Sequence, residues 1–409
     1  MRRIFFDFNN MMSYNIGKRH GVTESEFRQM SNPARRAQEH LTNLIKNSQN
    51  RINLNLEWTR LPYRGDKIIS EVRILGNEIA RTYRNVIFLG IGGSYLGLKA
   101  AQDALCPAYY NEFDRVRPGR PRIYFEGNNL DPDTIGILLK NLNPEETYIV
   151  VISKSGETTE TKVALATVEA WLKKKVGPKY GRQILAITDP ESGALRQRVN
   201  SEQAKDKLSF RSLPLERGVG GRYSEFNMGL LHLAIVGINP KEVLAGARAM
   251  TRRCLARPLS NNPALMYALL HTILYRKKEK SIAVMMPFSE TLKATGDWYA
   301  QLLGESLGKK YIRKITSFPG GMEKWEADRK RIIHLGRTPV ATRGTNDLHS
   351  IHQNNVEGEN NKVVTFIRAT NFTQKLRVPA NSGFISGKSY EELIKAAQEA
   401  TEWSLAREE

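Results

Sequence analysis

The sequence has very little cysteine, which limits the classes of protein it can represent. Cys106 and Cys254 are its two cysteines among 409 residues, and their spacing fits neither a metal site nor a disulfide framework. We therefore expect reduced thiols in a cytoplasmic protein. No apolar run approaches the length of a membrane span, so no membrane partner is expected. The opening MRRIFFDFNNMM is interrupted by Asp7 and asparagines, which is not the pattern of a signal peptide.

Acidic residues are also scarce relative to basic ones. Against 62 Lys and Arg there are 42 Asp and Glu, which gives a formal net charge of +20. Such a charge suits nucleic acid or small anionic metabolites. Because no finger, basic zipper or RNA-recognition motif accompanies it, no nucleic-acid partner is expected. The segment 309–337 holds nine Lys or Arg and three Asp or Glu, which favours a solvated surface insertion.

The sequence has no low-complexity stretch or short repeat, but it has regular alternation. About the first 80 residues are charged and helix-patterned, which predicts an N-terminal helical arm. Apolar runs of strand length then alternate with helical segments, and this alternation is typical of parallel doubly wound α/β sheets. The expected strands are 86–91, 122–126, 148–153 and 184–189 in a first set and 281–288 and 362–368 in a second set, which begins with a helix over 263–278. At this length, two or three domains are expected.

The segment GIGGSYLG (90–97) follows the first apolar run. Its glycines could serve a dinucleotide, a sugar phosphate or a tight turn. Tyr95 occupies the third glycine position of the dinucleotide fingerprint. Glu126, which could imitate the ribose-binding acid, lies farther along the chain than the usual spacing of about 20 residues. What remains is a glycine turn with Gly93 and Ser94 at a helix start, and both a ligand loop and a structural turn fit it.

The segment SKSGETTET (153–161) leaves the third expected strand and enters a helix. It offers four hydroxyl groups close together, with a lysine and a glycine among them. These residues are Ser153, Ser155, Thr158 and Thr159, together with Lys154 and Gly156. Hydroxyls and backbone N–H groups at a helix start suit a phosphate dianion. Helix capping is the alternative, but a cap needs one such residue and not four, so phosphate binding is favoured.

Two further motifs combine glycine with a charged side chain. In GVGGRYS (218–224), Arg222 follows a glycine pair, and a guanidinium there could stabilise an anion that develops during a reaction. In GESLGK (304–309), Glu305 ends an amphipathic helix. Taken alone, the arginine would favour a surface turn and the glutamate a solvated side chain.

A fifth motif, GTNDLHSIHQ (344–353), carries two histidines. His349 and His352 are three residues apart and could face a metal ion. Because no third ligand has a suitable spacing, a metal site is not expected.

These five motifs, in this order, resemble the signatures of the glucose-6-phosphate isomerase family, especially of its bacterial members, from about residue 50 onwards. The resemblance implies two doubly wound sugar-isomerase (SIS) domains. It also implies the interconversion of glucose 6-phosphate and fructose 6-phosphate through an enediolate, in glycolysis and gluconeogenesis, without a metal or organic cofactor. In this family a histidine enters the site from the neighbouring subunit, so a homodimer is implied.

The resemblance also implies a role for each residue already singled out. Glu305 would be the base that moves a proton between C2 and C1, Arg222 would stabilise the enediolate, and His349 would help to open the sugar ring. The residues expected to hold the substrate are Gly93, Ser94, Ser153, Lys154, Ser155, Thr158 and Gly221. One carboxylate and one fixed positive charge are what an aldose–ketose shift needs.

We expect an N-terminal helical arm over 1–49, a first sugar-isomerase domain over 50–218 and a second over 219–409. The family carries a later segment with the pattern QxGVExxK, whose lysine assists ring opening, and nothing here matches it. Lys388 lies in an earlier element. The second domain is therefore expected to be C-terminally incomplete, with reduced turnover.

Two other functions remain as alternatives. A sugar-phosphate-binding protein with little or no catalysis would be consistent with the missing lysine segment. Retention of Glu305, Arg222 and His349 favours the enzyme, because a binding protein needs no base. A nicotinamide-dependent enzyme is disfavoured by Tyr95.

Overall fold

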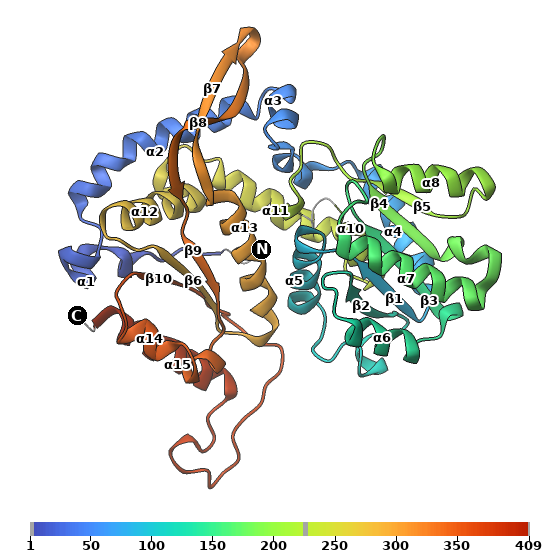
Figure 1. The fold of residues 1–409 in the computed structure, drawn as a ribbon. Coiled ribbons are helices and arrows are strands. Elements are labelled where there is room, and N and C mark those ends of the chain that lie inside the picture. The colour runs from blue at the N-terminus through green and yellow to red at the C-terminus, as the bar shows by residue number, and fades with distance from the viewer. Residues whose placement is uncertain (1–3, 224–227, 408–409) are drawn as a thin grey trace. The chain divides into compact units, whose positions relative to one another are not determined.

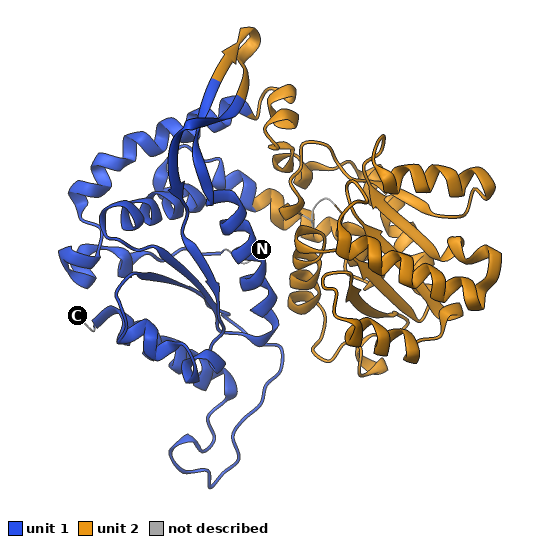
Figure 2. Cartoon of the chain, viewed as in Figure 1, with its two compact units in different colours: residues 1–44, 250–315, 325–409 blue, residues 45–249, 316–324 orange. Residues whose placement is uncertain are grey.

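The computed structural model describes residues 4–223 and 228–407, and it is a mixed α/β structure (Figure 1). The chain divides into two compact units (Figure 2). Unit 1 comprises residues 1–44, 250–315 and 325–409, and unit 2 comprises residues 45–249 and 316–324. The domain limits expected at residues 49 and 218 were drawn from sequence patterns, whereas the two units are defined by contacts in space. The two divisions answer different questions, so the expected limits remain predictions.

Unit 2 is built around a five-stranded parallel sheet with the order β2-β1-β3-β4-β5. Its strands are β1 (Asn85–Leu89), β2 (Arg122–Glu126), β3 (Thr147–Ile152), β4 (Ile184–Thr188) and β5 (Arg211–Pro214). Its helices are α3 (Ser48–Asn53), α4 (Asp66–Thr82), α5 (Leu96–Leu105), α6 (Pro132–Asn141), α7 (Thr159–Val176), α8 (Ala194–Lys205) and α10 (Leu230–Ile235), and α11 (Pro240–Cys254) begins in this unit.

Helices cover both faces of this sheet, as the continuous apolar strands predicted. Along β1, Val86 and Phe88 pack into a core with α4, α5 and α10. The alternate residues Ile87 and Leu89 pack into a second core with α6, α7 and α8. Side chains of a strand alternate between faces, so a strand buried on both faces must be apolar at every position. The doubly wound architecture of this unit is therefore confirmed.

Unit 1 contains a three-stranded parallel sheet with the order β10-β6-β9. Its strands are β6 (Ile282–Pro287), β9 (Thr338–Ala341) and β10 (Lys362–Ile367), and its helices are α1 (Ser13–His20), α2 (Glu24–Leu44), α12 (Pro263–Lys277), α13 (Lys293–Leu307), α14 (His352–Val356) and α15 (Tyr390–Arg407). The N-terminal helices expected from the sequence are present, and α2 packs on α12 through an apolar cluster. α13 packs against β6 and β9.

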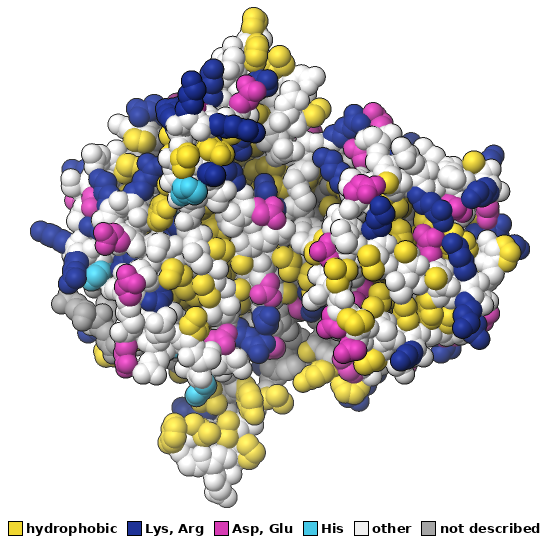
Figure 3. All heavy atoms as spheres, in the orientation of Figure 1, with side chains coloured by type: hydrophobic (Ala, Val, Ile, Leu, Met, Phe, Trp, Pro, Cys, Tyr) yellow, Lys and Arg dark blue, Asp and Glu magenta, His cyan; other side chains and the backbone are white. Residues whose placement is uncertain are grey.

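The basic segment 309–337 forms a two-stranded hairpin, β7 (Lys309–Phe318) and β8 (Met322–Leu335). Most of its side chains are exposed, as expected for a surface insertion, but Arg337 at its end is buried. The hairpin tip is held within unit 2, where buried Asn50 donates from Nδ2 to the Gly321 carbonyl at 2.8 Å and accepts from the Glu323 N–H at 2.8 Å. On the face drawn in Figure 3, Lys and Arg side chains are scattered over each unit and not gathered in one band.

Four strands of the described chain were not predicted from the sequence, namely the hairpin strands β7 and β8 and the edge strands β5 and β9. β5 is the half-exposed edge strand of the large sheet and lacks a continuous apolar run. β9 contains Pro339, which argues against a strand, but β9 lies at the edge of its sheet, where proline is tolerated. The other predicted strands agree with the observed bounds to within two residues at each end.

Candidate functional site

The first two loops singled out from the sequence follow neighbouring strands of the large sheet. β1 pairs with β3, with Leu89 opposite Val151, so the loops 90–95 and 153–158 leave the same edge side by side. The chain continues from β1 towards β2 on one side and from β3 towards β4 on the other. This divergence makes a topological switch point, which is where open α/β sheets bind ligands.

The first loop is shaped by its glycines. Gly92 has a φ of +57°, a conformation that L side chains rarely adopt. At Gly93 a Cβ would lie 1.7 Å from the Gly221 carbonyl oxygen, so this position has no room for a side chain. The Ser94 N–H donates to the Ile91 carbonyl at 3.1 Å, and the Ser94 side chain is half-buried. Tyr95 packs edge-on against an aromatic ring, Phe125, at 5.6 Å between centroids.

The second loop uses two of its hydroxyls to hold its own backbone. Ser153 Oγ accepts from the Gly156 N–H at 3.0 Å, and Ser155 Oγ accepts from the Glu157 N–H at 3.1 Å. Thr158 occupies the N-cap position of α7, yet its side chain makes no cap hydrogen bond. A hydroxyl that accepts one bond still has a proton to donate, so these residues remain able to bind an anion.

Exposure differs along this second loop. Ser153 is buried, whereas Lys154, Ser155 and Thr158 are exposed. The Lys154 carbonyl accepts from the Thr188 hydroxyl at 3.1 Å, and this bond joins the loop to the end of β4. The backbone is therefore fixed while three polar side chains face solvent.

The third loop carries Arg222 to the first loop. The contact of Gly221 with Gly93 is so close that a Cβ on Gly93 would also lie 2.7 Å from the Arg222 backbone nitrogen. Tyr223 stacks on Trp58 with centroids 5.0 Å apart. Burial raises the pKa of Tyr223, and the Arg222 cation opposes that shift. Residues 224–227, which include the last residue of the segment GVGGRYS, lie outside the described residues.

Asp189 belongs to none of the sequence motifs, yet it holds a turn that contacts the second loop. Asp189 is 7% exposed and follows β4. Its Oδ1 accepts from the N–H groups of Glu191 at 2.9 Å and Ser192 at 3.0 Å. Hydrogen bonds from these N–H groups, that from Glu191 first, lower the pKa of Asp189 although burial opposes them.

The turn held by Asp189 is in close contact with the Ser155 backbone. At Gly193, which has a φ of +97°, a Cβ would lie 2.8 Å from the Ser155 carbonyl oxygen. At Gly156 a Cβ would lie 2.5 Å from the Leu195 nitrogen. A sequence signal existed, because an aspartate ends the apolar run ILAITD and a glycine follows four residues later.

Glu305 lies in the last turn of α13, in unit 1, as the motif predicted. Its side chain is exposed, and its Oε1 accepts from Gln301 Nε2 at 2.9 Å. Lys309, the first residue of β7, donates from Nζ to the Glu305 carbonyl at 2.6 Å. A cation at this position complements the negative end of the helix.

His349 ends the short 3₁₀ helix η12 (Asn346–His349), which follows β9. Its side chain is exposed. Asp347 organises this turn and accepts from the Arg343 N–H at 2.7 Å and from Ser350 Oγ at 3.0 Å. Partial burial would raise the pKa of Asp347, but these hydrogen bonds outweigh it and lower the pKa.

Glu305 and His349 lie towards opposite ends of the small sheet. α13 runs antiparallel to β9, because a Cβ on Gly296 would lie 3.4 Å from Ala341 Cβ and one on Gly304 3.7 Å from Pro339 Cγ. From Gly296 to Glu305 the helix rises by about 13 Å. His349 instead follows the carboxyl end of β9, at the Ala341 side. The structure of unit 1 thus does not bring these two residues together.

Within residues 4–223 and 228–407, no three His, Cys, Asp or Glu side chains lie close enough to hold a metal ion. In that same part of the chain, no helix is both long and apolar enough to cross a bilayer.

Comparison of the sequence with protein families gives a match to the phosphoglucose isomerase model over residues 66–383. The chain is 38% identical to the glucose-6-phosphate isomerase of Carboxydothermus hydrogenoformans over 359 residues, which cover 86% of this chain and 72% of that protein. It is 28% identical to a probable glucose-6-phosphate isomerase of Methanococcus maripaludis, over 98% of this chain and 80% of that one.

Solved structures show the same fold. A hypothetical protein from Thermus thermophilus matches with a TM-score of 0.77 and 30% identity, over 93% of this chain and 82% of that one. A glucose-6-phosphate isomerase from Chlamydia trachomatis matches with a TM-score of 0.72 and 22% identity, over 95% of this chain and 73% of that one.

Proposed function

The chain belongs to the phosphoglucose isomerase family, and we propose that it is the aldose–ketose isomerase that interconverts glucose 6-phosphate and fructose 6-phosphate. The structural observation that carries this proposal is the switch point of the large sheet, where the Ser94 and Ser153 loops leave adjacent strands. The Arg222 loop touches the first of them. The alternative of a binding protein without catalysis is not favoured, because the relatives are named isomerases.

The phosphate group would bind to the first two loops. Ser153, Ser155 and Thr158 would donate hydroxyl protons to its oxygens, and Lys154 would supply a positive charge. Gly93, Ser94 and Gly221 would allow the ligand to approach the backbone closely. The hydrogen bonds that already hold Ser153 and Ser155 would spare the substrate the cost of ordering this loop.

Three groups would carry the chemistry. His349 would transfer a proton while the ring opens, and Glu305 would then remove the proton from C2 of the open-chain aldose. Arg222 would stabilise the negative charge on the resulting enediolate. Return of the proton from Glu305 to C1, together with transfer of the O2 proton to O1, completes the ketose, and the reverse sequence regenerates the aldose. No metal or organic cofactor is needed for this proton transfer.

A homodimer is part of the proposal. Glu305 and His349 lie towards opposite ends of the small sheet, which suits a site in which His349 comes from a second copy of the chain. We further place the enzyme in the cytoplasm, in glycolysis and gluconeogenesis. Cys106 and Cys254 are free thiols, which suits a reducing compartment.

A coupled assay for fructose 6-phosphate conversion, run in deuterated water, tests the reaction. Deuterium should appear at C2 of recovered glucose 6-phosphate, because the carboxylic acid formed from Glu305 exchanges with solvent. Turnover without exchange would contradict a proton shuttle and favour a hydride shift.

The double substitution Ser153→Ala and Thr158→Ala tests the phosphate site. It should raise KM for the sugar phosphate at least tenfold, since hydrogen bonds to a charged group contribute about 1.5–3 kcal/mol each. Thr167→Ala is the matched control, because Thr167 lies on α7 away from the loop and donates to the Val163 carbonyl. An unchanged KM in the double variant would move the phosphate elsewhere.

A further inference from the structure

The Arg222 side chain lies against its own loop. A Cβ on Gly220 would lie 3.5 Å from Arg222 Nη2, so the guanidinium occupies the space beside that glycine. Arg222 Cζ lies 6.0 Å from the centroid of the Tyr223 ring. Burial raises the pKa of Tyr223, and the charge of Arg222 and its hydrogen bond to the Tyr223 hydroxyl oppose that shift. The next residue in sequence thus contacts the cation through both its ring and its hydroxyl.

Tyr223 is held in turn by an aromatic ring from a distant part of the chain. Trp58, in the 3₁₀ helix η2 (Glu57–Thr59), stacks on Tyr223 with ring centroids 5.0 Å apart and an angle of 16° between the ring planes. Both side chains are half-buried. Stacked aromatic rings attract each other beyond the effect of the area they bury, so this contact favours one orientation of the tyrosine.

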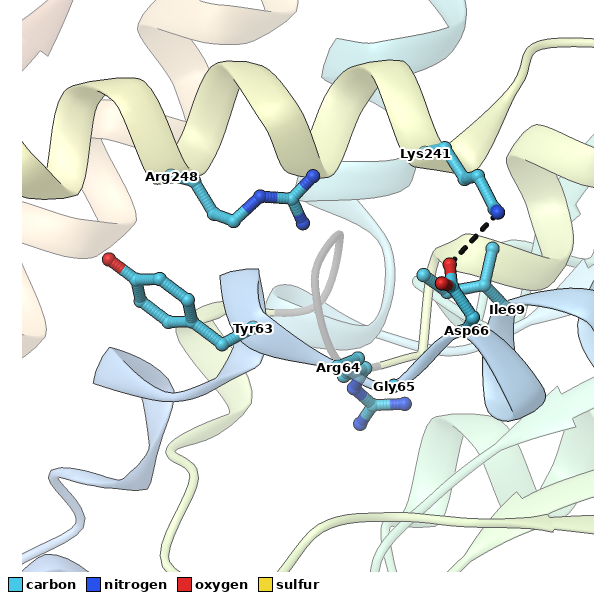
Figure 4. A pocket seen from close by; sticks show the side chains of 7 residues that line it. All are labelled: Tyr63, Arg64, Gly65, Asp66, Ile69, Lys241 and Arg248. Atoms are coloured by element: carbon cyan, nitrogen blue, oxygen red, sulfur yellow. Dashed lines mark ion pairs between the residues drawn. The ribbon is translucent and has the colours of Figure 1, made fainter.

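The segment that carries Trp58 is itself tied to α11 (Figure 4). Arg248 Nη1, on α11, donates to the Pro62 carbonyl at 2.8 Å. Lys241, also on α11, pairs with Asp66 at 2.9 Å. A cavity of about 330 Å³ lies beside these contacts, between α11 and the segment that leads into α4. The turn that follows Trp58 therefore has fixed neighbours of its own.

The same segment also holds the start of the third loop. Arg64 projects away from α11 (Figure 4) and pairs with Glu216 at 3.1 Å. The Glu57 N–H donates to the Gly218 carbonyl at 3.0 Å. One tied segment therefore contacts both the beginning of the third loop and the tyrosine beside its arginine.

We propose that Trp58 and Tyr223 are positioning residues, which orient the Arg222 guanidinium towards the negative charge that develops on the enediolate. The inference rests on the proposed function, in which Arg222 stabilises that charge. Stabilisation of this kind depends on donors that are fixed before the reaction, because a group that must first reorient loses part of its effect. The flexible arginine side chain gains this order from the hydroxyl and the stacked rings beside it.

Steady-state kinetics of two Trp58 variants test this role. Trp58→Ala should lower kcat about tenfold and change KM less than about twofold, since a misplacement of about 1 Å can cost up to about 100-fold in rate. Trp58→Phe should recover most of the loss, because it keeps a stacked ring. An unchanged kcat in Trp58→Ala, or a raised KM with an unchanged kcat, would overturn the inference.

Tyr83→Ala is the matched control. Tyr83 is a half-buried residue whose ring packs on Tyr148 with centroids 4.9 Å apart. It precedes β1, at the edge of the sheet opposite the loops. Its removal should reduce stability and leave kcat unchanged. An equal fall in kcat from Tyr83→Ala would mean that general loosening of unit 2, and not the orientation of Arg222, explains the effect.

A double-mutant cycle tests whether Trp58 acts through Arg222. In the Arg222→Ala background, Trp58→Ala should change kcat little further, because the group that it orients is already absent. Tyr223→Phe keeps the stacked ring and removes the hydroxyl, so it should lower kcat about threefold or more, and this loss should also vanish in Arg222→Ala. Equal effects with and without Arg222 would contradict the inference. If Trp58→Ala does not fold, the Tyr223→Phe cycle decides the question.

Nuclear magnetic resonance gives a measurement that does not depend on activity. The Nε–H signal of Arg222, assigned by its loss in Arg222→Ala, should report a rigid side chain in the wild type and in Tyr83→Ala, and a mobile one in Trp58→Ala. Equal mobility in all three would refute the positioning role. A chain without isomerase activity would refute the proposed function, whereas this signal would still decide whether Trp58 orders the arginine.

Discussion

Unit 2 and unit 1 present their candidate site residues in different ways. In unit 2 the loops are held by local contacts. The Ser153 and Ser155 hydroxyls accept hydrogen bonds from the backbone of their own loop, and Gly93 lies close to the Gly221 backbone. In unit 1, Glu305 and His349 project from exposed ends of elements.

The difference supports a division of roles in the proposed reaction, in which the loops of unit 2 are preorganised to bind the sugar phosphate and the exposed Glu305 and His349 of unit 1 carry the proton transfers. Substitutions of Glu305 and His349 in unit 1 should therefore change kcat, and substitutions in the Ser94 and Ser153 loops of unit 2 should change KM and stability. Arg222 also lies in unit 2, but its proposed role at the enediolate means that its substitution should change kcat.

The largest effect is expected at Glu305. Glu305→Gln should lower kcat by about 10² to 10⁴, the usual contribution of a general base, with KM and the melting temperature nearly unchanged because the side chain is exposed. Steady-state kinetics and thermal denaturation measure this. Glu357→Gln is the matched control, since Glu357 is exposed and accepts from Gln353 four residues earlier, just as Glu305 accepts from Gln301. Equal kcat in both variants would remove Glu305 from the reaction.

Mixing two impaired variants tests whether Glu305 and His349 of one site come from different copies of the chain. Glu305→Gln and His349→Ala chains should each be impaired, and co-refolded together they should recover about a quarter of wild-type activity, because half of the dimers are hybrids with one intact site. Activity is measured against the molar ratio of the two chains. No recovery, despite hybrids detected by mass spectrometry, would mean that Glu305 and His349 act within one chain.

Gly93→Ala tests the backbone contact in unit 2. The new methyl group would overlap the Gly221 carbonyl, so we expect a loss of about 1–3 kcal/mol of stability, as for overpacked positions, together with a raised KM. Gly136→Ala is the control. A Cβ there meets nothing within 4 Å, and in the α6 helix alanine should stabilise by about 0.5–1 kcal/mol. Urea unfolding compares them, and equal stability of the two variants would contradict the close contact.

The smallest effect is expected from Asp189. Its pKa is lowered in the folded chain, so its stabilising contribution is present above the unfolded pKa of about 3.9 and is lost as pH falls through the folded value. Asp189→Asn should reduce stability near neutral pH by about 1 kcal/mol and flatten the acid limb of the melting curve between about pH 5 and pH 2. Melting temperatures across that range measure it. A variant curve parallel to that of the wild type would exclude this titration.

Asp206→Asn serves as the comparison for that pH series. The pKa of Asp206 is also lowered, chiefly by its hydrogen bond with Arg182, but this carboxylate belongs to an ion pair at the protein surface. Surface ion pairs contribute little to stability, so Asp206→Asn should change the melting temperature little. Asp206 is not one of the residues proposed to bind the substrate, so KM should also stay unchanged. Asp189→Asn, in contrast, should raise KM modestly, because the turn that Asp189 holds presses on the Ser155 backbone.

Elements with a local signal could be predicted from the amino-acid sequence. The apolar runs of β1, β3 and β4 are buried on both faces, and burial at every position leaves a continuous pattern that needs no partner to be recognised. The helix starts after Ser94 and Ser153 and the helix end at Glu305 were likewise predicted where they lie, because glycine and hydroxyl patterns are local too.

Features that join residues far apart in the chain could not be predicted from local patterns and are seen only in the folded protein. β5 and β9 are edge strands held by pairing, and their own residues carry weak strand signals. Three features join segments that are distant in sequence. They are the contact of Gly93 with Gly221, the contact of Gly193 with the Ser155 backbone, and the cavity between α4 and α11. Periodicity along a chain reports which side of an element is buried, but it does not report which distant backbone buries it. The placement of Glu305 and His349 towards opposite ends of one sheet follows from the antiparallel course of α13 against β9, and that course exists only once the sheet has formed.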